Sequence, residues 1–181
     1  MNSPEDVLGL WFAPGNESKW FEKDEAFDRA IETALLPLHE KAAAGALDAW
    51  LEDERGCLAL CILLDQVPRN VFRGQARAFA TDAQARAVTH HVIERGFGRS
   101  MTQSERSFFL MPLEHSEDLA DQELCCRLMA ELSDHPDWLT YAERHREIIA
   151  RFGRFPHRNE ALGRVTTAEE ATFLMEPNSS F

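Results

Sequence analysis

The chain has 181 residues, of which 44% are hydrophobic and 28% are charged, and its formal net charge at pH 7 is −12. This length and composition are typical of one folded domain with a substantial apolar core and are not typical of a disordered protein. The acidic balance argues against a nucleic-acid partner, because a basic face supplies much of that affinity. We therefore expect a single globular domain over residues 1–181.

No targeting or membrane signal is visible in the sequence. The first residues, MNSPEDVLGLWF, have neither a basic start nor a long apolar run, so they do not resemble a signal peptide. No segment approaches the roughly 18 uninterrupted apolar residues of a transmembrane helix. The four cysteines form no CxxC pair, which is typical of reduced thiols in a core. We expect a cytoplasmic protein that does not bind membranes.

Apolar residues recur at helical spacing along the chain, and no stretch alternates as a β-strand does. Ser3 and the stretch 166–170 have the residue types of helix N-caps, while Gly96 and Gly153 are typical of C-caps. Pro37 is expected to kink or divide its helix. The fold class is all-α, with roughly eight to ten helices. The predicted helices cover about residues 3–13, 24–44, 47–51, 55–66, 82–95, 102–113, 116–132, 137–152 and 166–174.

Two arginine-rich motifs follow strongly apolar predicted helices. The first runs from Asp65 to Arg77 (DQVPRNVFRGQAR), mostly within a predicted loop over residues 67–80. The second runs from His145 to Arg164 (HREIIARFGRFPHRNEALGR), where a glycine and a proline interrupt the helix. Each motif combines a proline, an arginine, an asparagine and a nearby glycine. Neither contains a lysine, which excludes a Schiff-base lysine from both motifs.

The arginines of these motifs suit an anion site. A guanidinium group offers a planar fork of donors that matches a carboxylate or a phosphate. If the two motifs converge, they form a polar pocket for a small anionic molecule. The alternative is structural, because arginines also cap helices and pair with acids to hold loops. The candidate ligand-binding residues are Arg69, Asn70, Arg73, Arg77, Arg154, Arg158 and Asn159.

A histidine among acids, in the stretch 114–118 (EHSED), forms the second candidate site. On a helix, His115 shares a face with Asp118 three residues later, and the two make a plausible acid-base pair. The alternative is a solvated helix face or the acidic half of a salt-bridge network. The spacing matches no standard metal motif, so we expect no metal ligands, and the sequence leaves any cofactor unknown. The candidate catalytic residues are His115, Glu117, Asp118 and His157.

Taken together, these motifs resemble a mainly bacterial family known as domain of unknown function 924. The resemblance extends from Trp11 to Leu174 and includes four long strings in order: LLDQVPRN (63–70), FRGQARAFATD (72–82), MPLEHSEDLADQ (111–122) and RFGRFPHRNEALGR (151–164). It implies an all-helical fold of the tetratricopeptide-repeat-like kind, a compact right-handed array of helical hairpins. It implies no activity.

Two hypotheses about function follow. In the first, the arginine and histidine motifs line a pocket for a small phosphate- or carboxylate-bearing ligand, with His/acid proton chemistry if a reaction occurs. In the second, the protein is a non-catalytic helical scaffold that binds a peptide or a protein, and the motifs lock its helices. Arginines that converge with His115 on a closed pocket favour the first. Arginines paired with internal acids beside an open apolar groove favour the second. The sequence leaves the oligomeric state open.

Overall fold

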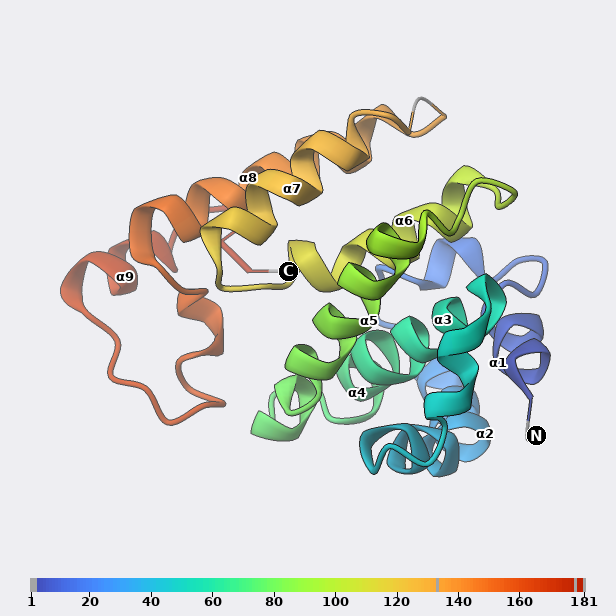
Figure 1. Cartoon of the computed structure of the whole chain (residues 1–181). Coiled ribbons are helices and arrows are strands. Elements are labelled where there is room, and N and C mark those ends of the chain that lie inside the picture. The colour runs from blue at the N-terminus through green and yellow to red at the C-terminus, as the bar shows by residue number, and fades with distance from the viewer. Residues whose placement is uncertain (1–2, 133, 178, 181) are drawn as a thin grey trace. The chain divides into compact units, whose positions relative to one another are not determined.

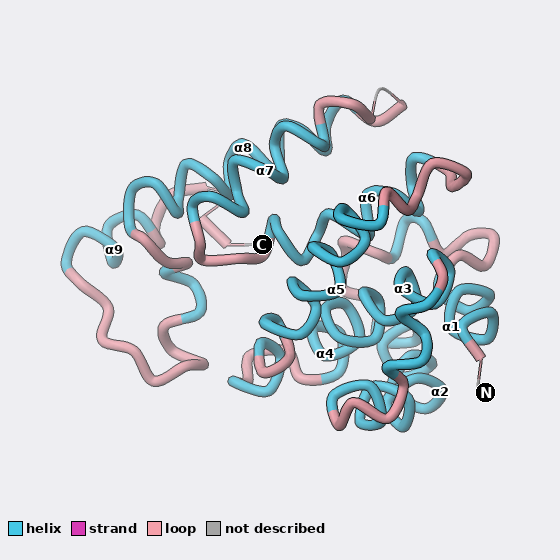
Figure 2. Tube along the Cα trace, viewed as in Figure 1, coloured by secondary structure: helices cyan, strands magenta, loops and turns pink. Residues whose placement is uncertain are grey.

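The computed structural model describes residues 3–132, 134–177 and 179–180, and these form helices, turns and loops without a strand (Figures 1 and 2). The predicted all-α class is confirmed. Packing divides the chain into two compact units. Unit 1 runs to Arg73 and continues over Arg77–Pro112, and unit 2 holds Gly74–Ala76 and the chain from Leu113 onward. The expectation of a single domain stays a prediction.

The helices of the first part of the chain follow its apolar pattern. They are α1 (Pro4–Trp11), α2 (Glu25–Ala43), α3 (Glu54–Cys61), α4 (Val67–Val71), α5 (Asp82–Arg95) and α6 (Gln103–Glu114). A π-helical turn (Ile62–Gln66) joins α3 to α4. Short 3-10 helices cover Glu17–Lys19, Asp48–Glu52 and Ala76–Phe79.

Unit 2 contains α7 (Leu119–Met129), α8 (Pro136–Phe152), the short 3-10 helix η5 (Pro156–Arg158) and α9 (Ala168–Phe173). Helices α7 and α8 lie side by side, and loop fills the stretch between η5 and α9 (Figures 1 and 2). The right-handed, tetratricopeptide-repeat-like arrangement of hairpins stays a prediction.

Several helix ends agree with the sequence. Ser3 forms a capping box with Asp6 at the start of α1, so that one side chain satisfies a backbone N–H that has no partner within the helix. Helices α5 and α8 end at Gly96 and Gly153, each with φ of 67°, a conformation that glycine adopts without steric cost. Pro37 lies inside α2, which is one continuous helix rather than two.

Helix α3 forms the centre of the unit 1 core, because every residue from Gly56 to Cys61 on it is buried. A Cβ atom added to Gly56 would lie 2.1 Å from the carbonyl oxygen of Trp50, so only glycine allows this approach of two backbones. Burial raises the pKa of the Cys61 thiol well above its usual range. All four cysteines are free and buried, as the sequence predicts.

The π-helical turn after α3 has an identifiable cause. Pro68 has no N–H to give to the carbonyl groups of the preceding turn. Side chains satisfy two of those carbonyls instead: the Leu63 oxygen lies 2.8 Å from Nδ1 of His39, and the Leu64 oxygen accepts from Oγ1 of Thr81 at 2.5 Å. Both hydrogen bonds are buried. Neither carbonyl oxygen of the π-helical turn is therefore left without a partner in the core.

The structure corrects two predicted boundaries. The loop predicted over residues 67–80 is wrong in its first part, because Arg69 and Asn70 lie in α4, which resumes after the π-helical turn. The helix predicted over residues 116–132 begins only at Leu119, and a turn joins α6 to α7. Nε2 of the fully buried Gln122 lies within 3.3 Å of three backbone oxygens, two in the last residues of α6 and one, that of Ser116, in the turn.

Candidate functional site

Arg69 of the first motif is committed to carboxylates within unit 1. Its guanidinium group makes two bonds of 3.0 Å to the carboxylate of Asp82 and lies 3.0 Å from Asp65, whose side chain is 1% exposed. The same group donates to the backbone oxygen of Asp65 at 2.8 Å. Bidentate pairing of this kind fixes both partners and joins α4 to the start of α5.

The other residues of the first motif also contact acids of unit 1. Arg73 makes a bidentate pair with Asp28 at 3.1 and 3.0 Å, and Asn70 donates to the same carboxylate at 2.7 Å. Arg77 lies 2.7 Å from Glu40, and both of these side chains are more than half exposed. The motif thus ties α4 and the segment after it to α2.

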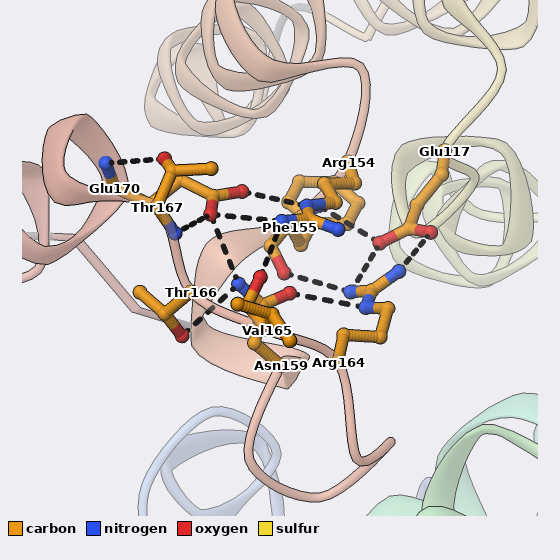
Figure 3. A network of polar contacts seen from close by, with 9 residues as sticks. All are labelled: Glu117, Arg154, Phe155, Asn159, Arg164, Val165, Thr166, Thr167 and Glu170. Atoms are coloured by element: carbon orange, nitrogen blue, oxygen red, sulfur yellow. Dashed lines mark hydrogen bonds and ion pairs between the residues drawn. The ribbon is translucent and has the colours of Figure 1, made fainter.

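Arg154 and Asn159 of the second motif meet on one acid, as Figure 3 shows. Arg154 makes bonds of 2.6 and 2.8 Å to the carboxylate of Glu170, and Asn159 donates to it at 3.3 Å. The hydrogen bond from Arg154, with a second from the backbone N–H of Thr167, lowers the pKa of Glu170 to about 2. These contacts fasten the start of α9 to the end of α8.

Glu117 is the centre of the neighbouring network in Figure 3. It accepts two bonds from Arg164, at 2.8 and 3.0 Å, and one from the backbone N–H of Phe155 at 2.8 Å. Burial raises the pKa of the Glu117 carboxyl, but these hydrogen bonds outweigh burial, and the pKa lies below its ordinary value. A carboxylate held in this way by an arginine is a structural contact within unit 2.

The helix face predicted to hold both His115 and Asp118 is not formed. Both residues lie in the turn between α6 and α7, where three-residue spacing no longer places side chains together. Asp118 is the N-cap of α7 and accepts from the backbone N–H of Ala120 at 2.9 Å. Ser116 supports this turn, because its hydroxyl donates to the buried carboxylate of Asp121 at 2.8 Å and accepts from the backbone N–H of Asp118 at 3.1 Å.

A different pair of an acid and a histidine is present in unit 2. Nδ1 of His145 on α8 lies 2.8 Å from the backbone oxygen of Tyr141 and 3.2 Å from the carboxylate of Glu114. Glu114 and His145 are 8% and 4% exposed, so the pair is shielded from water. Burial, with the nearby His115, lowers the pKa of His145 to about 3, and the imidazole is neutral at pH 7.

Two further histidines and an arginine lie near this pair. The ring of His115 lies 6.1 Å from that of His145, and the ring of Phe155 lies 5.6 Å from both His145 and His157. The guanidinium carbon of Arg158 sits 4.4 Å from the centre of the Phe155 ring, a cation–π contact. Arg158 is 6% exposed. We call these residues, Glu114, His115, His145, His157 and Arg158, the histidine cluster.

Sequence reasoning placed three members of this cluster among its candidates, namely His115, His157 and Arg158. Glu114 and His145 lie in the two candidate stretches but were not among the candidate site residues. A signal for His145 existed: it lies three and four positions before Ile148 and Ile149 and therefore on the buried face of its helix. No local pattern marks Glu114, because its partner comes from a distant segment.

A shallow groove lies on the surface of unit 2, between α8 and α9, with a volume of about 310 Å³. Its apolar part comes from Ile148, Phe152 and Phe173. Its charged part comes from Arg144 and Arg151, which are not among the predicted anion-binding arginines, and from Glu147 and Glu176. The groove is thus amphipathic and open to solvent.

Over residues 3–132, 134–177 and 179–180, no group of three or more His, Cys, Asp or Glu side chains is arranged to hold a metal ion. In the same part of the chain, no helix combines the length and the apolar character needed to cross a bilayer.

Comparison with known proteins agrees with this architecture. Residues 7–178 match the family described as bacterial protein of unknown function, DUF924. The solved structure of a protein of unknown function from Agrobacterium tumefaciens is 44% identical in sequence, with a TM-score of 0.90, over 94% of this chain and 96% of that one. No curated protein matches the chain. The resemblance predicted from the motifs is confirmed, and the chain belongs to the bacterial DUF924 family.

Proposed function

We propose that the protein binds a small anionic ligand, carrying a phosphate or a carboxylate, at the histidine cluster of unit 2. The supporting observation is the convergence of His115, His157 and Arg158 around His145 and the ring of Phe155. Side chains that donate hydrogen bonds or carry positive charge outnumber the acid among them, Glu114. An anion can therefore accept hydrogen bonds from several members of the cluster.

The proposed site is smaller than the sequence indicated. Most of the predicted ligand-binding residues hold acids of the protein itself, so an external anion would have to displace a carboxylate that is already bound. In the proposal these residues hold helices and loops together, and Arg158 contacts the ligand. The framing residues are Arg69, Asn70, Arg73, Arg77, Arg154 and Asn159.

Thermal unfolding with and without inorganic phosphate tests this proposal. A ligand that binds only the folded state stabilises it by about 2.7 kcal/mol at one hundred times its dissociation constant, which raises Tm by about 5–10 °C here. Arg158→Gln and His157→Gln should abolish this rise. Arg127→Gln, an exposed arginine of α7, should leave it unchanged. Because Arg158 is buried, circular dichroism must show that its variant is folded, and His157→Gln serves if it is not.

A second candidate function, the peptide-binding scaffold, is favoured by the groove between α8 and α9. Its occupant would be a peptide with one apolar side chain in the groove and a carboxylate paired with Arg144 or Arg151. Arg151 forms an ion pair with Glu169, and the two side chains are 46% and 64% exposed. Replacing Glu169 with a peptide carboxylate as the partner of Arg151 therefore costs little free energy.

Selection from a displayed peptide library tests the second candidate. Recovered peptides should share an apolar residue beside an acidic one and should lose binding to an Arg144→Glu, Arg151→Glu variant. Phosphate binding at the histidine cluster should be unchanged in that variant. Peptides without this pattern, or binding that survives the charge reversal, would exclude the groove.

A further inference from the structure

We propose that the groove between α8 and α9 receives an amphipathic helix of another protein, which lies along α8 and places an apolar side chain in the groove. Two acids of that helix, seven positions apart, pair with Arg144 and Arg151, and a base between them pairs with Glu147. The inference rests on the second candidate function, because it names the occupant of the same groove.

The residues that α8 contributes to the groove lie on one face of that helix. They occupy positions 144, 147, 148, 151 and 152, and intervals of three and four residues bring side chains together on a helix. Tyr141, which is 49% exposed, lies one turn before them, and its ring centre is 5.7 Å from the guanidinium carbon of Arg144. The face from Tyr141 to Phe152 is about 16 Å long, so it can support a partner helix of about three turns.

The charges on this face alternate in sign. Glu147 follows Arg144 by three positions, and Arg151 follows Glu147 by four. Within the described part of the chain, the side chains of Arg144 and Glu147 make no hydrogen bond or ion pair. Among the same residues, Arg151 donates only through Nε, to Glu169 at 3.0 Å, which leaves its two terminal nitrogens for a further acceptor. A partner can therefore pair with all three charged groups.

The spacing of these charges fits a helix better than an extended chain. Along the axis of α8, Arg144 and Glu147 are about 4.5 Å apart, and Glu147 and Arg151 are about 6 Å apart. A helix packed alongside α8 repeats both intervals, because its own residues three and four positions apart rise by the same amounts. Side chains on one face of an extended chain are about 6.6 Å apart and match only the longer interval.

The size of the groove suits a side chain rather than a backbone. Its volume of about 310 Å³ is at the lower limit for a small-molecule pocket. Ile148, Phe152 and Phe173 give it an apolar floor, in which the ring centres of the two phenylalanines are 5.1 Å apart. The guanidinium carbon of Arg151 lies 4.6 Å from the centre of the Phe152 ring. An acid paired with Arg151 therefore lies beside the apolar anchor, three or four positions from it on the partner helix.

A second copy of this chain fits the same face less well. If α8 packs on itself about a two-fold axis between Glu147 and Ile148, residue 144 of one copy meets residue 151 of the other. Both are arginines, and like charges in contact oppose association. A partner helix with acids at the two facing positions avoids this repulsion. Charge complementarity thus favours a different protein as the occupant.

Calorimetric titration of the full chain with a synthetic peptide tests the inference. The probe has about 15 residues, the length at which an isolated helix becomes marginally stable. It carries two glutamates seven positions apart, with lysine and leucine three and four positions after the first, on a background of alanine and glutamine. Both orders of lysine and leucine are used, because the partner helix can run in either direction. One order should bind, and the ¹³C chemical shifts of the labelled peptide should become helical. A proline in the central turn should weaken binding about 100-fold.

Charge reversal tests the pairing directly. Arg144→Glu should weaken binding of the probe about 5-fold, and exchanging the facing glutamate of the probe for lysine should restore it. Arg127→Glu, at an exposed position of α7, should leave binding unchanged. Arg144 is exposed too, so circular dichroism should show that both variants are folded.

The outcomes separate this inference from the second candidate function. Equal affinity of the probe and its proline variant would overturn the helix and keep the groove. Library peptides that bind through Arg151, while neither order of the probe binds, would do the same. An absence of binding by the probe and by every library peptide would overturn both. A chain that is dimeric in sedimentation experiments and monomeric as Arg144→Glu, Arg151→Glu would show that a second copy covers this face, against the inference.

Discussion

His145 makes the stability of the folded chain depend on pH. Its pKa is about 3 in the folded protein, and that of a histidine in the unfolded chain is about 6.5. Between these values the unfolded chain binds a proton that the folded chain does not, so stability falls as the pH falls from 6.5 toward 3. We expect His145 alone to remove about 2 kcal/mol between pH 7 and pH 5.

Urea unfolding of the protein and of His145→Asn at both pH values measures this contribution. Asparagine keeps a donor for the backbone oxygen of Tyr141 and does not titrate, so the variant should lose about 2 kcal/mol less than the wild type on acidification. His135→Asn, at an exposed position, should behave as the wild type does. Equal losses in wild type and His145→Asn would show that His145 is protonated in the folded state.

At the residue scale, the sequence indicated the important residue types but not their partners. It marked Glu117 as a candidate base, yet Glu117 pairs with Arg164, which lies 47 positions away. It grouped His115 with Asp118 as residues of one helix, yet both lie between the end of α6 at Glu114 and the start of α7 at Leu119. Such pairs depend on which segments meet in three dimensions, and spacing along one helix carries no information about that.

At the element scale, Gly56 is the position where we expect an added Cβ atom to change the stability of the fold most. Gly56→Ala places a methyl group against the backbone oxygen of Trp50, at 2.1 Å if nothing moves, and should cost about 3 kcal/mol or more. Gly9→Ala is the matched control, because Gly9 lies within α1 and nothing is within 4 Å of its added Cβ atom. That change should stabilise the protein by about 0.5–1 kcal/mol, because alanine favours a helix. Chemical denaturation measures both, and similar effects of the two variants would contradict the packing of α3 described above.

The π-helical turn provides a second prediction for an element. Thr81→Val removes the hydroxyl that donates to the carbonyl of Leu64 and leaves a buried oxygen without that bond, at a cost of about 1–3 kcal/mol. Thr33→Val removes a similar bond, to the backbone oxygen of Arg29, at an exposed position and should change stability by about 0.5 kcal/mol or less. Equal costs in denaturation experiments would mean that the turn does not depend on Thr81.

Local signals explain why the helices could be predicted and the turns between them could not. Apolar spacing and caps such as Ser3 and Gly153 act within a few residues, and those helices begin or end close to where the sequence indicated. The π-helical turn depends on His39 and Thr81, from two other segments, to accommodate Pro68. The start of α7 depends on the hydrogen bond of Ser116 to Asp121, for which no helical pattern gives a sign.

At the scale of the whole molecule, the stability of different segments should be uneven. Every residue of α3 from Gly56 to Cys61 is buried, whereas α9 has six residues, of which Glu170 and Phe173 are buried. A short helix with little buried surface opens without unfolding the rest of the chain. Hydrogen exchange followed by mass spectrometry should therefore be about 100-fold faster in peptides that cover residues 160–175 than in those that cover 54–61.

The same exchange experiment tests what the arginines of the second motif do. Arg154 holds Glu170 and also donates to the backbone oxygen of Val165 at 2.8 Å, so it ties both the loop and α9 to the end of α8 (Figure 3). Arg154→Gln should speed exchange over residues 160–175 and leave residues 54–61 unchanged, whereas Arg127→Gln should affect neither. Faster exchange over 54–61 as well would mean that α9 opens only when the whole chain unfolds. Unchanged exchange over 160–175 would mean that Arg154 does not secure α9, and an anion-binding role for Arg154 would then regain its place beside Arg158.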